Sequence, residues 1–124
     1  MAQEHQYTTQ EEADAYDAVI SVFTELFKEL KDLGKKKPEA VLSSSKVRLL
    51  NKVLADVANC LEGAPDHKYL DMLDDEALPQ YSDAILMLSQ YDGALKAFRE
   101  RHFGYQNHLG THAWYVQKGK GASA

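Results

Sequence analysis

Histidine and arginine side chains near the C-terminal end of the chain are the residues best suited to chemistry. His102 follows an apolar stripe of a predicted helix at helical spacing, so it faces the core rather than solvent. The stripe consists of Tyr81, Ile85, Leu88, Tyr91, Leu95 and Phe98. His102 is therefore either a half-buried histidine favoured by the helix dipole, or an interior ligand or acid–base group assisted by Arg99.

Two further histidines, His108 and His112, follow His102 but do not form a recognisable metal site. Gly104 and Gly110 interrupt this segment, so no His-x-x-x-His pair lies within one predictable helix. A structural zinc site needs converging ligands, which often include thiolates. The single cysteine is remote in sequence and fits a small core residue. We therefore predict that the protein has no metal site.

Arg101 and His108 carry a resemblance to a family of nucleases. Six residues separate the arginine from the histidine, which is similar to the Arg-x4–6-His pattern of the helical HEPN ribonucleases. The resemblance implies that both side chains act on the 2′-hydroxyl and phosphate of RNA, usually across a dimer. His102 stands where that family commonly has an asparagine or another polar residue.

A second resemblance involves His102 and covers about a third of the chain. The segments 65–73 and 98–102 are similar to the sequence around the proximal histidine of indoleamine 2,3-dioxygenase-like haem proteins. The resemblance implies that His102 is the axial ligand of a haem iron and that the helix stripe lines the haem pocket. The family's glycine- and threonine-rich loop is reduced here to residues 109–111. Because this chain is far shorter than such enzymes, its pocket would be degenerate or shared between subunits.

Apolar residues at intervals of three and four predict an all-α fold, a compact helical bundle of three long helices and one short helix. The long helices are expected over about 9–34, 43–61 and 79–103. Thr9 and Glu12 fit a capping box at the start of the first. Its apolar stripe consists of Tyr16, Val19, Ile20, Phe23, Leu26, Phe27, Leu30 and Leu33.

Glycine and proline positions suggest where these helices end or meet. Gly34 is expected to stop the first helix and Gly63 to close the second. Pro79 suits the first turn of the last helix, and Gly93 within that helix indicates a close helix crossing, a bend or a ligand against the backbone. The short helix is expected over 66–73, with three side chains facing inward: Tyr69, Leu70 and Leu73.

The chain is expected to form one domain flanked by two less regular ends. Residues 1–8 are expected to be flexible, residues 9–103 to form the bundle, and residues 104–124 to form an irregular tail with disordered last residues. Trp114 and Tyr115 make this tail aromatic. Because exposed tryptophan is unfavourable in water, the tail either folds back on the helices or docks on a partner.

Composition limits the classes of function. The 124 residues are 44% hydrophobic, which predicts one domain with a real core, and the net charge of −5 makes nucleic-acid binding unlikely. No apolar run approaches the ~18 residues of a membrane span, so no membrane association is expected. The single Cys60 predicts a cytoplasmic location without an internal disulfide.

These patterns favour a non-catalytic interaction subunit without a cofactor, which acts through helix faces in a homo-oligomer or with a protein partner. The alternatives are a haem protein with His102 as axial ligand and a HEPN-like ribonuclease that uses Arg101 and His108. Val22 and Ala18 lie beside the main stripe of the first helix and widen its apolar surface. This surface is expected to meet another chain, isologously in a homodimer, unless the aromatic tail covers it.

Overall fold

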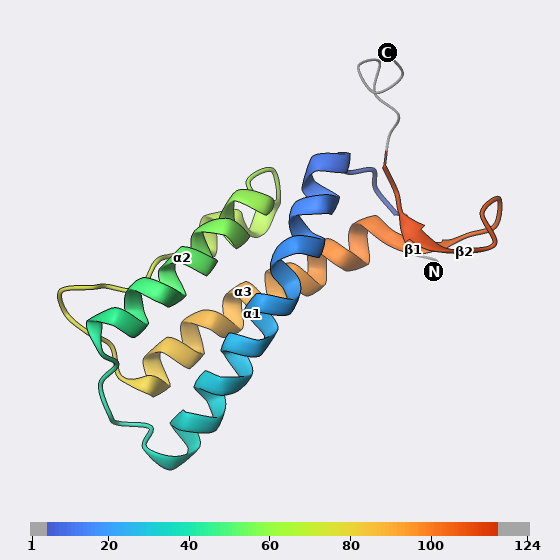
Figure 1. The fold of residues 1–124 in the computed structure, drawn as a ribbon. Helices are drawn as coiled ribbons and strands as arrows, with labels where there is room; N and C mark the ends of the chain where they lie inside the picture. The colour runs from blue at the N-terminus through green and yellow to red at the C-terminus, as the bar shows by residue number, and fades with distance from the viewer. Residues whose placement is uncertain (1–4, 117–124) are drawn as a thin grey trace.

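The computed structural model describes residues 5–116. Its elements are, in chain order, α1 (Gln10–Lys36), α2 (Ser44–Cys60), the 3-10 helix η1 (Pro65–Tyr69), α3 (Tyr81–His102), β1 (Phe103–Gln106) and β2 (Thr111–Trp114). Helix α1 is central because it packs against both α2 and α3, whereas α2 and α3 touch each other little. Figure 1 shows α1 crossing α3 and running antiparallel to α2. The protein is therefore mostly helical, as predicted. Within the described residues, no helix is both long enough and apolar enough to cross a membrane.

The start of α1 follows its capping residues. Thr9 is the N-cap, and its Oγ1 accepts a hydrogen bond from the Glu12 N–H at 3.0 Å. The Glu12 carboxylate accepts from the hydroxyl of Thr8 at 2.7 Å, instead of returning to the Thr9 backbone as in a full capping box. This part of the prediction is confirmed except for the partner of the carboxylate.

The predicted end of α1 at Gly34 is wrong, because the helix continues to Lys36. Gly34 is buried, and a Cβ atom there would lie 2.5 Å from Cδ1 of Ile85 on α3. The missing side chain therefore lets α1 and α3 approach closely. Of the alternatives for Gly93, the close helix crossing is wrong, since Gly93 is exposed and a Cβ atom there would have nothing within 4 Å.

Helices α2 and α3 lie close to their predicted positions. Ser43 is the N-cap of α2, and its Oγ accepts from the Lys46 N–H at 3.2 Å. Helix α3 begins one residue after its N-cap Gln80, so Pro79 precedes the helix rather than lying in its first turn. The Pro79 carbonyl instead accepts from the Leu42 N–H at 2.9 Å, which ties the two inter-helix connections together.

The helix predicted over 66–73 is largely wrong. Only η1 is helical, and the chain then runs without regular structure between α2 and α3. Tyr69 is 60% exposed rather than inward, Leu70 is half-buried, and Leu73 is buried as expected. The Asn51 side chain binds both the N–H and the carbonyl of Leu73, at 2.9 and 2.8 Å, and so holds this segment extended.

The irregular tail expected from residue 104 is replaced by a β-hairpin as far as residue 114. Strands β1 and β2 pair antiparallel, with Phe103 opposite Trp114 and Gln106 opposite Thr111. Gly110 in the turn has a φ of 67°, a backbone conformation that glycine adopts without strain. The predicted disorder of the last residues lies outside the described residues.

The segment 5–8, expected to be flexible, is bound to the C-terminal end of the domain. The Gln6 N–H donates to the Arg101 carbonyl, and the Thr8 N–H donates to the Tyr115 carbonyl, each at 2.8 Å. Thr8 also forms a parallel bridge with Val116. These pairings connect the two ends of the domain beside the hairpin.

Candidate functional site

His102 lies at the end of α3, where it anchors the segment 5–8. Its Nδ1 is 2.7 Å from the Gln6 carbonyl oxygen, and its half-buried ring lies edge-on against Phe98 with centroids 4.7 Å apart. A carbonyl only accepts hydrogen bonds, so Nδ1 is the donor in this contact. This placement matches the structural interpretation of His102.

The surroundings of His102 do not match those implied for haem. An axial histidine ligand of haem needs an apolar slot beside its free ring nitrogen. The α3 side chains assigned to that slot are packed in the helical core, where Tyr91, Leu95 and Phe98 are at most 2% exposed. The haem interpretation stays a hypothesis that absorbance in the Soret region would test.

Arg101 and His108 belong to different parts of the structure. An Arg101 guanidinium nitrogen lies 3.4 Å from Asp66 Oδ1, so the arginine is directed toward η1. His108 is exposed in the turn of the hairpin, beyond the four residues of β1. A strand of this length spans about 13 Å. The two residues are therefore not brought together within one chain, and the ribonuclease interpretation would require the pairing across a dimer.

The remaining candidates pack against aromatic rings. The Arg99 guanidinium lies over the Phe103 ring at 4.3 Å from its centroid. His112 stacks on the same ring, and its edge meets Tyr105. Across the described residues, no group of three or more His, Cys, Asp or Glu side chains could hold a metal ion.

The aromatic tail folds back on its own domain. The Trp114 ring packs against Tyr16 and Phe98, with centroid distances of 5.1 and 5.8 Å, and its Nε1–H donates to Asp17 Oδ2 at 3.3 Å. Tyr115 stacks on His5. Of the two alternatives left open by the sequence, the structure shows the tail packed within the chain.

The tail leaves another face of α1 open. Ala18 and Val22 are exposed, Val22 to 47%, in a groove of about 790 Å³ between α1 and α2. The apolar residues that line this groove, which we call its floor, are Ala15, Ala18, Val19, Val22, Val53 and Cys60. We call this hollow the α1–α2 groove.

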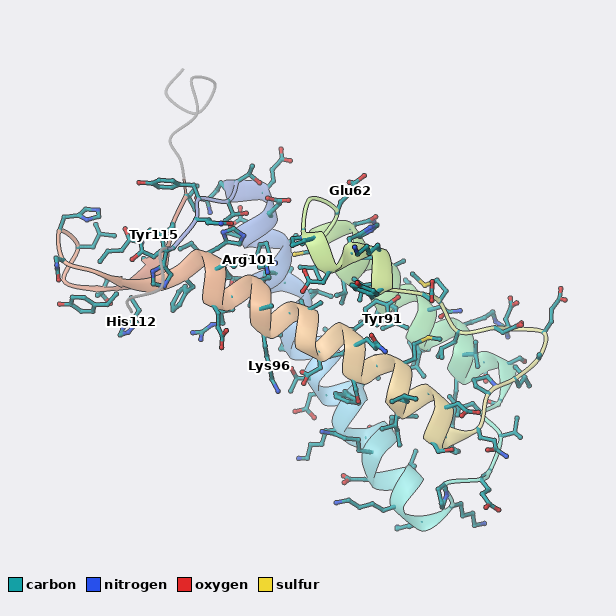
Figure 2. All side chains as sticks on the ribbon, turned by 180° about the vertical axis from the view of Figure 1, so that it is seen from behind. Glu62, Tyr91, Lys96, Arg101, His112 and Tyr115 are labelled. Carbon is teal, nitrogen blue, oxygen red and sulfur yellow. The ribbon has the colours of Figure 1, made fainter. Side chains whose placement is uncertain are left out.

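The rim of the α1–α2 groove is acidic. Its charged residues are Glu11, Glu12, Asp56 and Glu62, and none of the described residues that line it is a lysine or arginine. Figure 2 labels Glu62 just beyond α2. This end of α2 has no basic residue in its last turn, so the negative end of the helix dipole adds to the carboxylates. The groove therefore combines an apolar floor with a negative potential.

The cysteine in the groove is chemically inert. Burial, together with smaller effects of the nearby carboxylates of Glu12 and Asp17, raises the pKa of the Cys60 thiol to about 11. The thiol is thus protonated at neutral pH and is a poor nucleophile. Its Sγ lies 3.5 Å from the Glu12 carbonyl oxygen, so it packs as part of the floor. The groove is suited to binding rather than to thiol chemistry.

The same face continues toward the other end of α1. A smaller hollow of about 170 Å³ lies there, lined by Leu26 and Leu33 of α1 and Leu49 of α2. Its charged lining residues are Glu29 and Lys46, which have opposite signs. The two ends of this face therefore differ in charge.

Sequence reasoning found the apolar part of this face but missed its acidic rim. Asp56 and Glu62 are the only acidic residues between positions 40 and 63. Both lie toward the C-terminal end of α2, where the helix dipole disfavours negative charge. Acidic residues at the disfavoured end of a helix are therefore the sequence signal that could have indicated the acidic rim.

Comparison with known proteins adds no family assignment. No protein-family model matches the chain, and neither a curated protein nor a solved structure is significantly similar to it.

Proposed function

We propose that this protein is a small, non-catalytic interaction subunit that presents the face of α1 and α2 to another polypeptide. The observation that supports this proposal is the α1–α2 groove, with Val22 47% exposed on its apolar floor. Burying apolar surface contributes about 25 cal/mol per Å². A partner that covers this floor would remove its apolar side chains from water, and this burial would stabilise the complex.

The side chains proposed for chemistry are engaged within the chain. His102 binds the Gln6 carbonyl, and Arg101 pairs with Asp66. These contacts support structural roles for the two residues. They favour a protein that binds over one that catalyses.

We also propose that the protein works in the cytoplasm, with a protein partner or a second copy of itself. Cys60 is a free, buried thiol, and such a thiol is compatible with a reducing compartment. The partner would meet the two helices along their length.

The test compares two substitutions in the native complex. Val22→Glu places a carboxylate on the groove floor, whereas Leu86→Glu makes a similar change at a 67% exposed position of α3 outside the groove. An unpaired buried carboxylate disfavours association. In size-exclusion chromatography of extracts from the source cells, wild type and Leu86→Glu should elute in a complex, and Val22→Glu as the free 13.9 kDa chain. Circular dichroism should show equal helicity for all three.

A wild-type chain that elutes from such extracts as a free 13.9 kDa species would overturn the proposed function. So would a complex that survives Val22→Glu unchanged.

A further inference from the structure

The open face of α1 carries a straight apolar stripe. Ala15, Val22, Leu26 and Leu33 follow one another at intervals of seven, four and seven residues, which places them on one side of the helix. Each lines one of the two hollows between α1 and α2. The 18 residue steps from the first to the last span about 27 Å at 1.5 Å per residue. The stripe has the length of a five-turn helix.

The bundle geometry fits a further helix at this stripe. Helix α1 already has α2 on one side and α3 on another, and Figure 1 shows α1 and α2 side by side and antiparallel. Two antiparallel helices form a groove into which a third helix packs by inserting its apolar side chains. A helix in the groove would complete a four-helix arrangement. An extended strand would leave its backbone hydrogen bonds unpaired there.

The charges along the face select the kind of helix. Four carboxylates surround the groove at the start of α1, while the smaller hollow toward the other end is lined by one acid and one base, Glu29 and Lys46. Charge complementarity between partners guides association and fixes orientation. An occupant with cationic side chains at one end matches this asymmetry.

A second copy of the chain does not complement this charge asymmetry well. In an isologous pair with antiparallel α1 helices, the acidic end of one face would meet the Glu29 and Lys46 end of the other, and with parallel α1 helices the two acidic ends would meet. In the antiparallel pair, one ammonium group would oppose four carboxylates together with a fifth from Glu29. The charge balance favours a different protein.

We infer that the α1–α2 groove binds an amphipathic helix of a partner protein, with its lysine or arginine residues at the end that lies next to Glu11 and Glu62. This inference rests on the proposed function and specifies its partner. The apolar side of the partner helix packs on Val22 and Leu26. Its cationic end pairs with the acidic rim.

Two synthetic peptides test this inference on the purified full-length protein. Both are helical 18-residue peptides with the same leucine and alanine stripe, and their flanking positions near one end carry either four lysines or four glutamates. Fluorescence anisotropy should show binding of the lysine peptide at least about tenfold tighter than the glutamate peptide, with the difference shrinking as salt rises.

Three variants locate the binding. Val22→Gln, which adds no charge, should weaken the lysine peptide about tenfold, and Leu86→Gln should leave it unchanged. The double variant Glu11→Gln, Glu62→Gln should bring the two peptides closer in affinity. Circular dichroism of each variant confirms that it is folded.

The other outcomes overturn the inference and separate it from the proposed function. Equal binding of both peptides would show that charge does not select the partner. An affinity that is unchanged by Val22→Gln would show that the peptide binds elsewhere. If neither peptide binds, the groove does not take a helix of this kind. A purified dimer that dissociates on Val22→Glu would make the occupant a second copy. In each case the size of the native complex still decides the proposed function.

Discussion

Asn51 binds the connection between α2 and α3 through two hydrogen bonds, and replacing it tests how much these bonds contribute to stability. Its Nδ2 donates to the Leu73 carbonyl at 2.8 Å, and its Oδ1 accepts from the Leu73 N–H at 2.9 Å. Each bond contributes about 0.5–1.5 kcal/mol net, so Asn51→Ala removes about 1–3 kcal/mol. Alanine is the better helix former by about 0.5 kcal/mol. The free energy of unfolding should therefore fall by about 0.5–2.5 kcal/mol.

Asn59→Ala is the matched control, because it makes the same change at an exposed position of the same helix. Urea unfolding followed by far-UV circular dichroism gives the free energy of unfolding of both variants. Asn59→Ala should be neutral or slightly stabilising, so the two variants should differ by about 1–3 kcal/mol. A difference below about 0.5 kcal/mol would refute the reasoning that these two bonds hold the connection.

Three further perturbations test the core, the tail and a buried phenol. Phe23 is 1% exposed, so Phe23→Ala should lower the free energy of unfolding by about 3–5 kcal/mol; a loss below about 1 kcal/mol in urea titrations would mean that α1 is rotated. Trp114 is the only tryptophan, and its packed ring predicts emission that shifts to longer wavelength on unfolding and is weakly quenched by acrylamide in the folded protein. Burial, and to a lesser extent the Asp71 carboxylate, raises the pKa of Tyr91 from 10.0 to about 12. The stability that depends on the neutral phenol is complete below pH 10 and is lost as the pH rises toward 12, by about 3 kcal/mol. Tyr91→Phe should reduce this alkaline decline in urea titrations at different pH values, and an unchanged decline would contradict the assignment.

The long helices could be predicted because their signals are local. Thr9 and Ser43 cap the helices they were expected to cap, and the apolar stripe of α1 faces the core at Tyr16, Phe23 and Leu30. Capping and periodicity both depend on residues within a few positions of each other. Such patterns survive in the folded structure because the core reinforces them.

The errors arise where distant residues decide the local structure. Gly34 carries the signal of a helix end, but its contact with Ile85 gives it a packing role that sequence spacing does not reveal. The hairpin strands have four residues each, and a two-stranded hairpin is marginal alone. Trp114 stabilises it by packing on Tyr16, almost a hundred residues earlier in the chain.

Only the apolar part of the candidate site could be predicted from the sequence, because the acidic part depends on how two helices pack. The extra apolar surface at Val22 follows from helical spacing alone, and the structure places it in a groove. The acidic rim joins Glu11 of α1 to Asp56 and Glu62 at the far end of α2, and only the antiparallel packing of the helices brings them together. Conversely, three histidines close in sequence have separate surroundings in the structure: His102 contacts Gln6, His108 is exposed, and His112 packs on Phe103.

The parallel pairing of the segment 5–8 with the end of the hairpin determines how the domain responds to mechanical load. Thr8 bridges Val116 in parallel and its N–H donates to the Tyr115 carbonyl. A pull applied at residues 5 and 116 acts along these two segments in opposite directions, so it shears the bond between Thr8 and Tyr115 instead of peeling it open. The rate of forced unfolding then depends on the barrier to breaking this contact. Tension applied at the two ends of the domain therefore loads this pairing before it reaches the helices.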